Sequence, residues 1–417
     1  MAGIRTEKLG LYLSIPFCRS KCTYCNFASG VYPAGEHDRY VARLIEDLES
    51  ASAWAVGVGA HLPRTVDTVY LGGGTPSLLE PHLIAKLFAC IKASFDVEAN
   101  AEITVECAPG QIADETLESL AVSGVNRVSL GVQSFVDREA QVSGRLHNRA
   151  VVMDDLRRLR AAGISNLNVD LIAGLAGQTA ASWNESLNGL IECDVPHASV
   201  YMLEVDEDSR LGREMLAGGA RYHAGLVPTD DTIARMYETA IDRLSAAGLE
   251  QYEISNFARS GCRSQHNLRY WKRRPYLGIG LDASSMLRGI GETEELVLRS
   301  TTTDDLKDYL ERAEPPKKNW LSRVEQHEEA WFLGLRLIEG VDPSEIEQEF
   351  RREARGMALA VTETAVADGL LEWSRARVRL TPRGRLLSNE VFQRFLEISS
   401  EKQTTAPGPE VLASRSA

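Results

Sequence analysis

Apolar segments rich in β-forming residues alternate with helix-length amphipathic segments over about the first 200 residues of the chain. The strand-like segments are residues 11–15, 67–73, 102–107, 127–133, 167–174 and 198–205. The helix-like segments between them are residues 38–50, 81–95, 113–124, 150–163 and 182–193. A strand followed by a helix, repeated, builds βα units whose strands run parallel in one sheet. The sequence therefore predicts an α/β fold.

Polar and glycine residues gather where these predicted strands end. Three cysteines follow the first strand, the run Gly72–Thr75 follows the second, and Glu106, Gln133 and Asp170 lie in or at the ends of the next three. Ligands of parallel α/β sheets bind at the carboxyl ends of the strands. The pattern predicts that these residues form one active site.

Composition limits the class of protein. The chain of 417 residues has a formal net charge of −13, whereas nucleic-acid binders need clustered Lys and Arg to neutralise phosphates. We therefore expect no nucleic-acid partner. The N-terminal residues contain no apolar h-region followed by a small-residue cleavage site, so we expect no signal peptide, and no apolar run of about 18 residues occurs, so we expect no membrane span. These expectations predict a cytoplasmic protein whose closely spaced cysteines serve metal or redox chemistry.

The segment "CRSKCTYC" places Cys18, Cys22 and Cys25 within eight residues. A structural zinc site needs four ligands, and no second cysteine pair or HxxxH motif is present. A thioredoxin-like pair would use Cys22 and Cys25 and leave Cys18 without a role. Three thiolates instead suit a 4Fe–4S cluster with one iron open to an exogenous ligand, with zinc as the alternative.

The C-x3-C-x2-C motif after the first strand resembles that of the radical S-adenosylmethionine (SAM) superfamily. The resemblance implies a partial (β/α)6 barrel whose open iron chelates the amino and carboxylate groups of SAM. The run "GGGTP" resembles the superfamily's second motif, in which glycine backbone approaches the methionine amino group. The SAM contacts implied by this resemblance are Tyr12, Tyr24, Gly73, Gly74, Thr75, Glu106, Gln133, Arg145 and Asp170. Alternatively, these side chains form ion pairs, hydrogen bonds and core contacts at the barrel mouth.

Further segments resemble the oxygen-independent coproporphyrinogen oxidase group over nearly the whole chain. They are "LYLSIPFC", "GGGTPS", "LGVQSF", "GRLH", "VDLIAGL", "YEISNFA" and "HNLRYW". The decarboxylases of that group carry an additional cysteine where this chain has Phe27, whereas its HemW-like haem chaperones lack it and carry H-N-x-x-Y-W. Here that motif is His266, Asn267, Tyr270 and Trp271.

The resemblance thus implies a chaperone that binds haem and delivers it to acceptor haemoproteins, with His266 as the candidate haem ligand. Imidazole is a common axial ligand of haem iron, although His266 could equally hydrogen-bond a loop. The alternative function is oxidative decarboxylation of coproporphyrinogen III, and radical chemistry on another substrate is a third. The chain departs from the group's usual pattern at Ser14, Ala176 and Ser284, which bears on the substrate side.

From about residue 300 the strand–helix rhythm stops. Helices are predicted over 328–340 and 358–373, followed by a short hairpin and a helix within 376–396, as in a winged helix. This part resembles the C-terminal domain of the same group. We therefore expect a barrel domain over 1–300, a small helical domain over 301–397 and a disordered tail over 398–417.

Overall fold

The computed structural model describes residues 7–350 and 355–396. The chain divides into two compact units, Met1–Trp320 and Leu321–Ala417. The boundary expected between residues 300 and 301 therefore falls inside the first unit. The tail expected to be disordered, residues 398–417, lies outside the described residues.

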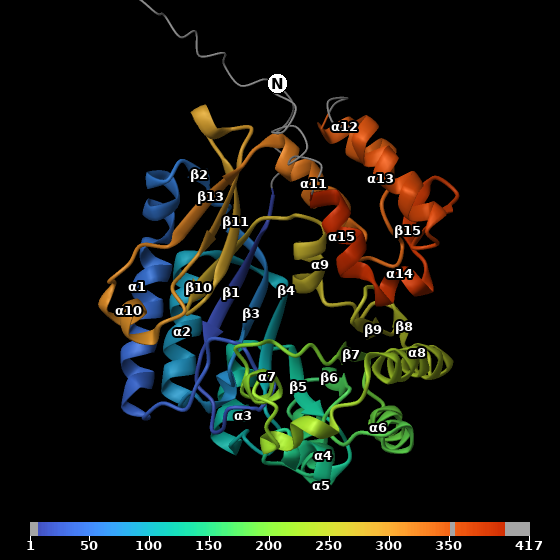
Figure 1. Cartoon of the computed structure of the whole chain (residues 1–417). Helices are drawn as coiled ribbons and strands as arrows, with labels where there is room; N and C mark the ends of the chain where they lie inside the picture. Colours follow the sequence, from blue (N-terminus) through green and yellow to red (C-terminus); the bar gives the residue numbers. More distant parts are fainter. Residues whose placement is uncertain (1–6, 351–354, 397–417) are drawn as a thin grey trace, which may run out of the picture. The chain divides into compact units, whose positions relative to one another are not determined.

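Six parallel strands of the first unit lie side by side in chain order (Figure 1). They are β1 (Leu9–Ile15), β3 (Thr65–Gly73), β4 (Asp96–Cys107), β5 (Arg127–Gln133), β6 (Asn166–Ala173) and β7 (His197–Met202). Each overlaps one of the predicted strand segments, although β4 begins at Asp96 and not at residue 102. In β1, both alternating faces are buried, as expected for a parallel strand covered on its two sides. The predicted α/β fold with a partial (β/α)6 barrel is confirmed.

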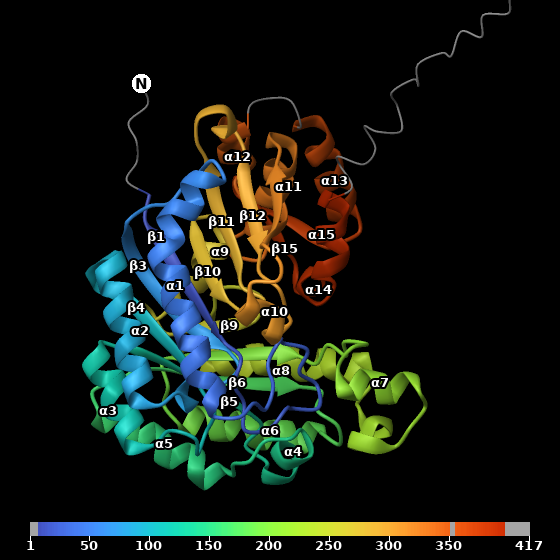
Figure 2. The ribbon, with the colours of Figure 1, turned by 90° about the vertical axis from the view of Figure 1, so that its left-hand side faces the viewer.

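Helices follow the first five strands and cover the outer face of this sheet (Figures 1 and 2). They are α1 (Gly35–Gly57), α2 (Pro81–Ser94), α3 (Asp114–Ser123), α5 (Arg149–Ala161) and α6 (Ala180–Glu192). The helix α1 buries Tyr40, Leu44 and Leu48, which lie on one face because they are spaced by four residues. A short helix, α4 (Asp137–Val142), precedes α5, and α7 (Arg210–Leu216), η2 (Arg221–Leu226) and α8 (Asp230–Ala246) follow β7.

The sheet continues beyond both edges of the predicted strands. At the first edge, β10 (Tyr276–Gly280) pairs parallel with β1, and β11 (Ser284–Gly289) and β12 (Val297–Thr301) extend the sheet antiparallel. The sheet ends there with β13 (Lys317–Leu321), while β2 (Ala60–His61) pairs with β11. At the other edge, β9 (Asn256–Ala258) pairs antiparallel with β7, followed by β8 (Glu250–Gln251). The remaining elements of this unit are η1 (Pro76–Leu78), α9 (Gln265–Trp271), η3 (Gly291–Thr293) and α10 (Leu306–Glu311).

The second unit is mainly helical and contains one hairpin. Its elements are α11 (Arg323–Gly334), α12 (Pro343–Phe350), α13 (Arg355–Ala367), β14 (Leu371–Ser374), β15 (Arg377–Leu380), α14 (Pro382–Leu386) and α15 (Ser388–Leu396). Trp331 stacks on Phe395 in its core, with ring centroids 5.1 Å apart. The helix predicted over 358–373 is wrong at its end, because Gly369 adopts a left-handed φ of 70° and Leu371–Ser374 is a strand.

Among the described residues, none of the helices combines the length and the apolarity that crossing a membrane requires.

Candidate functional site

The three cysteines lie in the loop between β1 and α1, residues 16–34, called here the cysteine loop. This loop is closed by its own backbone, because Cys18 N donates to Gly30 O (2.8 Å) and Gly30 N donates to Pro16 O (2.9 Å). The Lys21 ammonium donates to the carbonyls of Phe27 (2.5 Å) and Ser29 (2.8 Å) inside it. These bonds fold the segment into a compact turn at the carboxyl end of β1.

Each of the three thiols is half-buried. The Thr75 hydroxyl donates to Cys18 Sγ at 3.9 Å, and Cys25 Sγ lies 4.0 Å from Ser29 Oγ. Burial raises the pKa of the Cys18 thiol, and the neighbouring Cys25 and Cys22 raise it further. The thiols are therefore close enough to interact electrostatically.

Within residues 7–350 and 355–396, no group of three His, Cys, Asp or Glu side chains is arranged to hold a single metal ion. That result leaves the zinc alternative without a site in the described part of the chain. A 4Fe–4S cluster places a different demand on the thiolates, because each binds its own iron and they need not converge on one point. The cysteine loop is compatible with such a cluster.

The glycine run Gly72–Thr75 packs against the start of the cysteine loop. Gly74 N donates to Ile15 O and Thr75 N to Phe17 O, both at 2.8 Å. A Cβ on Gly74 would lie 2.7 Å from Ile15 O and 2.8 Å from Phe17 O. Backbone packing therefore requires glycine at residue 74, a reason that the sequence did not reveal. Gly73 has a φ of 99°, and its amide donates to Glu106 Oε2 at 3.2 Å.

Two half-buried carboxyl groups lie near the carboxyl end of β4 and within β6. Glu106 accepts from the Tyr70 hydroxyl at 2.7 Å, and burial raises its pKa to about 7, with a further increase from Asp170. Asp170 accepts from Ser129 Oγ (3.0 Å) and Asn168 Nδ2 (2.7 Å), and burial raises its pKa as well. Partly buried acids with raised pKa values are typical of functional sites, where a ligand compensates for their lost hydration.

Gln133 and Arg145 each have one polar side-chain atom that makes no hydrogen bond to the described residues. Gln133 Oε1 and Arg145 Nε are buried and have no partner among the described residues. Electrostatic interactions link the Arg145 guanidinium to Tyr24, Cys22 and Asp170, so it connects the cysteine loop with β6. Buried polar atoms in native proteins are nearly always paired. These two atoms, beside the acids and the glycine run, fit the hydroxyl, ammonium and carboxylate groups of SAM.

Tyr12, on β1, and His266 both lie close to Tyr70. The Tyr12 ring is centred 6.0 Å from Tyr70 and 6.5 Å from His266. His266, on α9, is 1% exposed, and its Nδ1 lies 2.9 Å from Thr68 Oγ1 and its Nε2 2.7 Å from the Tyr270 hydroxyl. Burial lowers its pKa to about 3, so the ring is neutral. His266 can bind a haem iron only after one of these hydrogen bonds breaks.

The positions that depart from the group's pattern have different surroundings. Ser14 is buried in β1, and its carbonyl accepts from the Tyr40 hydroxyl at 2.6 Å. Ser284 is exposed on β11 and lies 3.0 Å from Thr301 Oγ1, and Ala176 lies between β6 and α6. Phe27, in place of the additional cysteine, is 62% exposed on the cysteine loop.

Sequence reasoning missed several residues that position the site, namely Tyr70, Ser129, Gly131 and Asn168. A Cβ on Gly131 would lie 2.8 Å from Arg145 Nη2 and 3.1 Å from Gln133 Nε2, so glycine makes room for both side chains. Each lies two positions before a glycine or a predicted site residue of the same strand. Tyr70 precedes Gly72, Ser129 precedes Gly131, Gly131 precedes Gln133 and Asn168 precedes Asp170. Because strand side chains alternate between faces, that spacing of two could have identified them.

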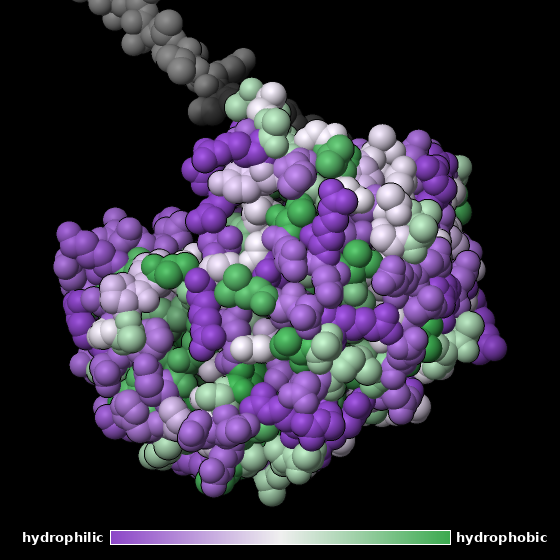
Figure 3. Space-filling model, turned by 90° about the horizontal axis from the view of Figure 1, so that it is seen from below, coloured by the Kyte–Doolittle hydropathy of each residue, from purple (hydrophilic) through white to green (hydrophobic). Residues whose placement is uncertain are grey.

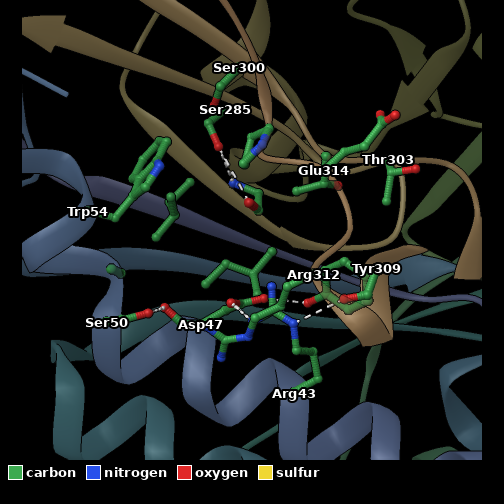
Figure 4. Close-up of a pocket in the computed structure, with 16 residues that line it drawn as sticks. Arg43, Asp47, Ser50, Trp54, Ser285, Ser300, Thr303, Tyr309, Arg312 and Glu314 are labelled. Carbon is green, nitrogen blue, oxygen red and sulfur yellow. Dashed lines mark hydrogen bonds and ion pairs between the residues drawn. The ribbon is translucent and has the colours of Figure 1, made fainter. Parts of the chain in front are cut away.

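The end of the barrel at which these strands finish faces the viewer in Figure 3, where apolar residues are interspersed among hydrophilic ones. A separate cavity of about 230 Å³ lies between α1 and β10–β12 (Figure 4). There Asp47 accepts from the Tyr309 hydroxyl at 2.6 Å and pairs with Arg43, beside Trp54. None of the predicted site residues lines this cavity, so it is distinct from the candidate site.

Comparisons with known proteins agree with this geometry. Residues 12–189 match the model of the radical SAM superfamily, and residues 321–387 match that of the HemN C-terminal domain. The chain is 34% identical to the protein named heme chaperone HemW of Lactococcus lactis, covering 92% of this chain and 96% of that protein. It is 30% identical to heme chaperone HemW of Escherichia coli, covering 94% and 99%.

Among solved structures, coproporphyrinogen III oxidase (HemN) from Escherichia coli superimposes with a TM-score of 0.78. It is 23% identical and covers 93% of this chain and 90% of that chain, which supports the fold. The resemblance stated from the motifs is thus confirmed by relatives that are 30% and 34% identical over nearly the full length of the chain. The chain belongs to the HemW family of the radical SAM superfamily.

Proposed function

We propose that this protein is a haem chaperone, which binds haem, delivers it to haem-requiring proteins and carries a 4Fe–4S cluster with bound SAM. The relatives named heme chaperone HemW, aligned over nearly their whole length, support the proposal. The observation that carries it against decarboxylation is Phe27, an exposed phenylalanine on the cysteine loop where the decarboxylases carry a cysteine.

The residues that would hold the cluster are Cys18, Cys22 and Cys25. Those that would hold SAM are Tyr12, Tyr24, Gly73, Gly74, Thr75, Glu106, Gln133, Arg145 and Asp170. When bound, the cluster supplies an open iron for the amino and carboxylate groups of SAM and a source of one electron. The guanidinium of Arg145 offers a fork of donors to a carboxylate, and the two acids accept from hydroxyl or ammonium groups.

Haem would be the cargo, and the helix α9 with His266, Tyr270 and Trp271 is the proposed haem region. As His266 is hydrogen-bonded at both ring nitrogens, haem ligation by this side chain would include release from Thr68 or Tyr270. Replacing His266 by alanine should alter the spectrum of bound haem. If His266 only supports α9, the variant loses thermal stability and its folded fraction keeps the wild-type haem spectrum.

Haem transfer under anaerobic conditions tests the proposal. The reconstituted protein should take up haem with a shifted Soret band and pass it to an apo-haemoprotein. With SAM and a reductant present, it should form no protoporphyrinogen from coproporphyrinogen III. Robust decarboxylation by the wild type would overturn the chaperone function in favour of the oxidase.

A matched pair of variants tests the cluster. Cys22→Ala should lose the roughly four irons expected of a cubane cluster, whereas Cys90→Ala, a half-buried cysteine on α2, should keep them. Full iron retention by Cys22→Ala would contradict the cluster assignment.

A further inference from the structure

A chain of buried hydrogen bonds runs from the carboxylate of Asp170 to the first residues of α9. Asn168 Nδ2 donates to Asp170 Oδ1 at 2.7 Å, and Asn168 Oδ1 lies 2.6 Å from His197 Nδ1. On the far side of the ring, His197 Nε2 lies 2.9 Å from the Tyr252 hydroxyl, which also accepts from Ser264 N at 3.2 Å. Asn168, His197, Tyr252 and Ser264 are all at most 4% exposed.

The direction of every bond in this chain follows from its two ends. The Asn168 NH2 group donates to Asp170 and the Asn168 oxygen faces His197, which is the orientation that suits a carboxylate acting as acceptor. Nδ1 of His197 must then carry the proton, which leaves Nε2 as an acceptor for the Tyr252 hydroxyl. At the other end, the Ser264 amide can only donate, and the Tyr252 oxygen receives it. Each donor–acceptor choice is therefore consistent from Ser264 to Asp170.

Burial holds the pKa of His197 well below its ordinary value, so the ring is neutral and has one donor and one acceptor. That protonation state is the one the chain of bonds requires. Two serines brace the Asn168 amide, because Ser129 Oγ (2.7 Å) and Ser199 Oγ (3.0 Å) also lie within hydrogen-bond distance of its Nδ2, whose two hydrogens are shared among these oxygens and Asp170. The Asn168 side chain is consequently held in one orientation.

Ser264 is the N-cap of α9, where its side chain accepts from Asn267 N. The same bonds that orient Asp170 thus end on the helix that carries His266. Consecutive bonds of one direction polarise each other in a buried, low-dielectric setting.

We infer that Asn168 and His197 are positioning residues for the Asp170 carboxylate, linked through Tyr252 to the start of α9. The inference rests on the proposed binding of SAM at Asp170. Neither Asn168 nor His197 is among the residues proposed to contact SAM. Their role is to fix the rotamer in which Asp170 presents its remaining acceptor sites.

Two substitutions of His197 separate positioning from simple support of the core. An asparagine side chain places its amide nitrogen where Nδ1 stood, so His197→Asn retains a donor for Asn168. A glutamine side chain reaches the place of Nε2, so His197→Gln retains contact with Tyr252 and loses the bond to Asn168. Both variants remove ring volume and should melt at similarly reduced temperatures.

SAM affinity should differ between them. Losing one buried neutral hydrogen bond corresponds to about a two- to tenfold change in dissociation constant, so His197→Gln should bind SAM weaker than His197→Asn by that factor. Iron content should equal that of the wild type in both. Tyr252→Phe, which keeps the ring and removes the hydroxyl, is the milder variant should either substitution prevent folding, and it should weaken SAM binding in the same range.

Equal SAM affinity in wild type, His197→Gln and Tyr252→Phe would overturn the inference. So would equal losses in the two His197 variants that follow their melting temperatures, because that result indicates support of the core alone. A wild type that binds no SAM would refute the proposed function instead. In that case, nitrogen NMR of the His197 side chain still decides, because an Nε2–H tautomer would overturn the chain of bonds and an Nδ1–H tautomer would support it.

Discussion

Replacing Glu106 by glutamine should stabilise the protein at alkaline pH while weakening SAM binding. Burial raises the pKa of this carboxyl to about 7 from its ordinary value of 4.5. The folded protein thus holds a proton that the unfolded chain releases. The free energy of unfolding must then fall as pH rises from about 4.5, and the loss is complete above about 7.

The size of this loss follows from the two pKa values. At pH 8 the ionised Glu106 destabilises the folded state by roughly 3 kcal/mol, and at pH 5 by about 1 kcal/mol. Glutamine removes that term, and its oxygen can still accept from the Tyr70 hydroxyl. Its NH2 group, however, would face the amide of Gly73, which loses an acceptor at a cost of about 1 kcal/mol. The variant should match the wild type near pH 5 and exceed it by about 2 kcal/mol at pH 8.

Urea unfolding of wild type and Glu106→Gln at pH 5 and pH 8, without SAM, measures this difference. Glu118→Gln, at an exposed glutamate on α3, is the control and should follow the wild type at both pH values. Calorimetry at pH 8 should show weaker SAM binding by Glu106→Gln, because a charge-assisted contact is worth about 1.5–3 kcal/mol. Unfolding free energies of wild type and Glu106→Gln that differ equally at both pH values would refute the argument.

Three further changes test other parts of the structure. Gly74→Ala should lower the iron content of reconstituted protein, because the new methyl group meets two backbone oxygens, whereas Gly57→Ala, with nothing within 4 Å, should not; equal iron in both would contradict this packing. Gly131→Ala should displace Arg145 and weaken SAM binding about tenfold in calorimetry with iron retained, and unchanged affinity would mean that Arg145 adapts or does not bind SAM. Trp331→Ala should destabilise the second unit by about 3–5 kcal/mol in thermal unfolding, since the stacked indole is buried, and a smaller loss than 1 kcal/mol would argue against that core.

The six parallel strands could be predicted because each contains a short apolar run bounded by helix-length amphipathic segments. That local pattern is visible in the sequence without knowledge of which strands pair. Their order followed from the βα rhythm. The strand β10 could not be assigned in this way, because its partner β1 lies at the other end of the unit and local sequence carries no trace of that pairing.

The sequence predicts which residues gather at the strand ends, but not the hydrogen bonds that connect them. Cysteine spacing and strand-end acids are visible in the sequence, so Cys18, Glu106 and Asp170 could be grouped together. The hydrogen bonds that occupy both nitrogens of His266 depend on Thr68 and Tyr270 meeting from separate elements. Residue type alone does not distinguish such a histidine from an available ligand.

The pairing of β1 between β3 and β10 has a consequence for synthesis on the ribosome. The chain emerges from its N-terminus, and β1 then has an open, apolar edge until Tyr276–Gly280 is made. The cysteine loop also lacks two of its hydrogen bonds until later residues are made, because Thr23 N donates to Ser143 O and Thr23 O accepts from Leu211 N. The thiols thus leave the ribosome before Ser143, Leu211 and β10, which complete the surroundings of the cysteine loop and β1. A nascent chain arrested before residue 276 should expose both the strand edge and the unloaded thiols.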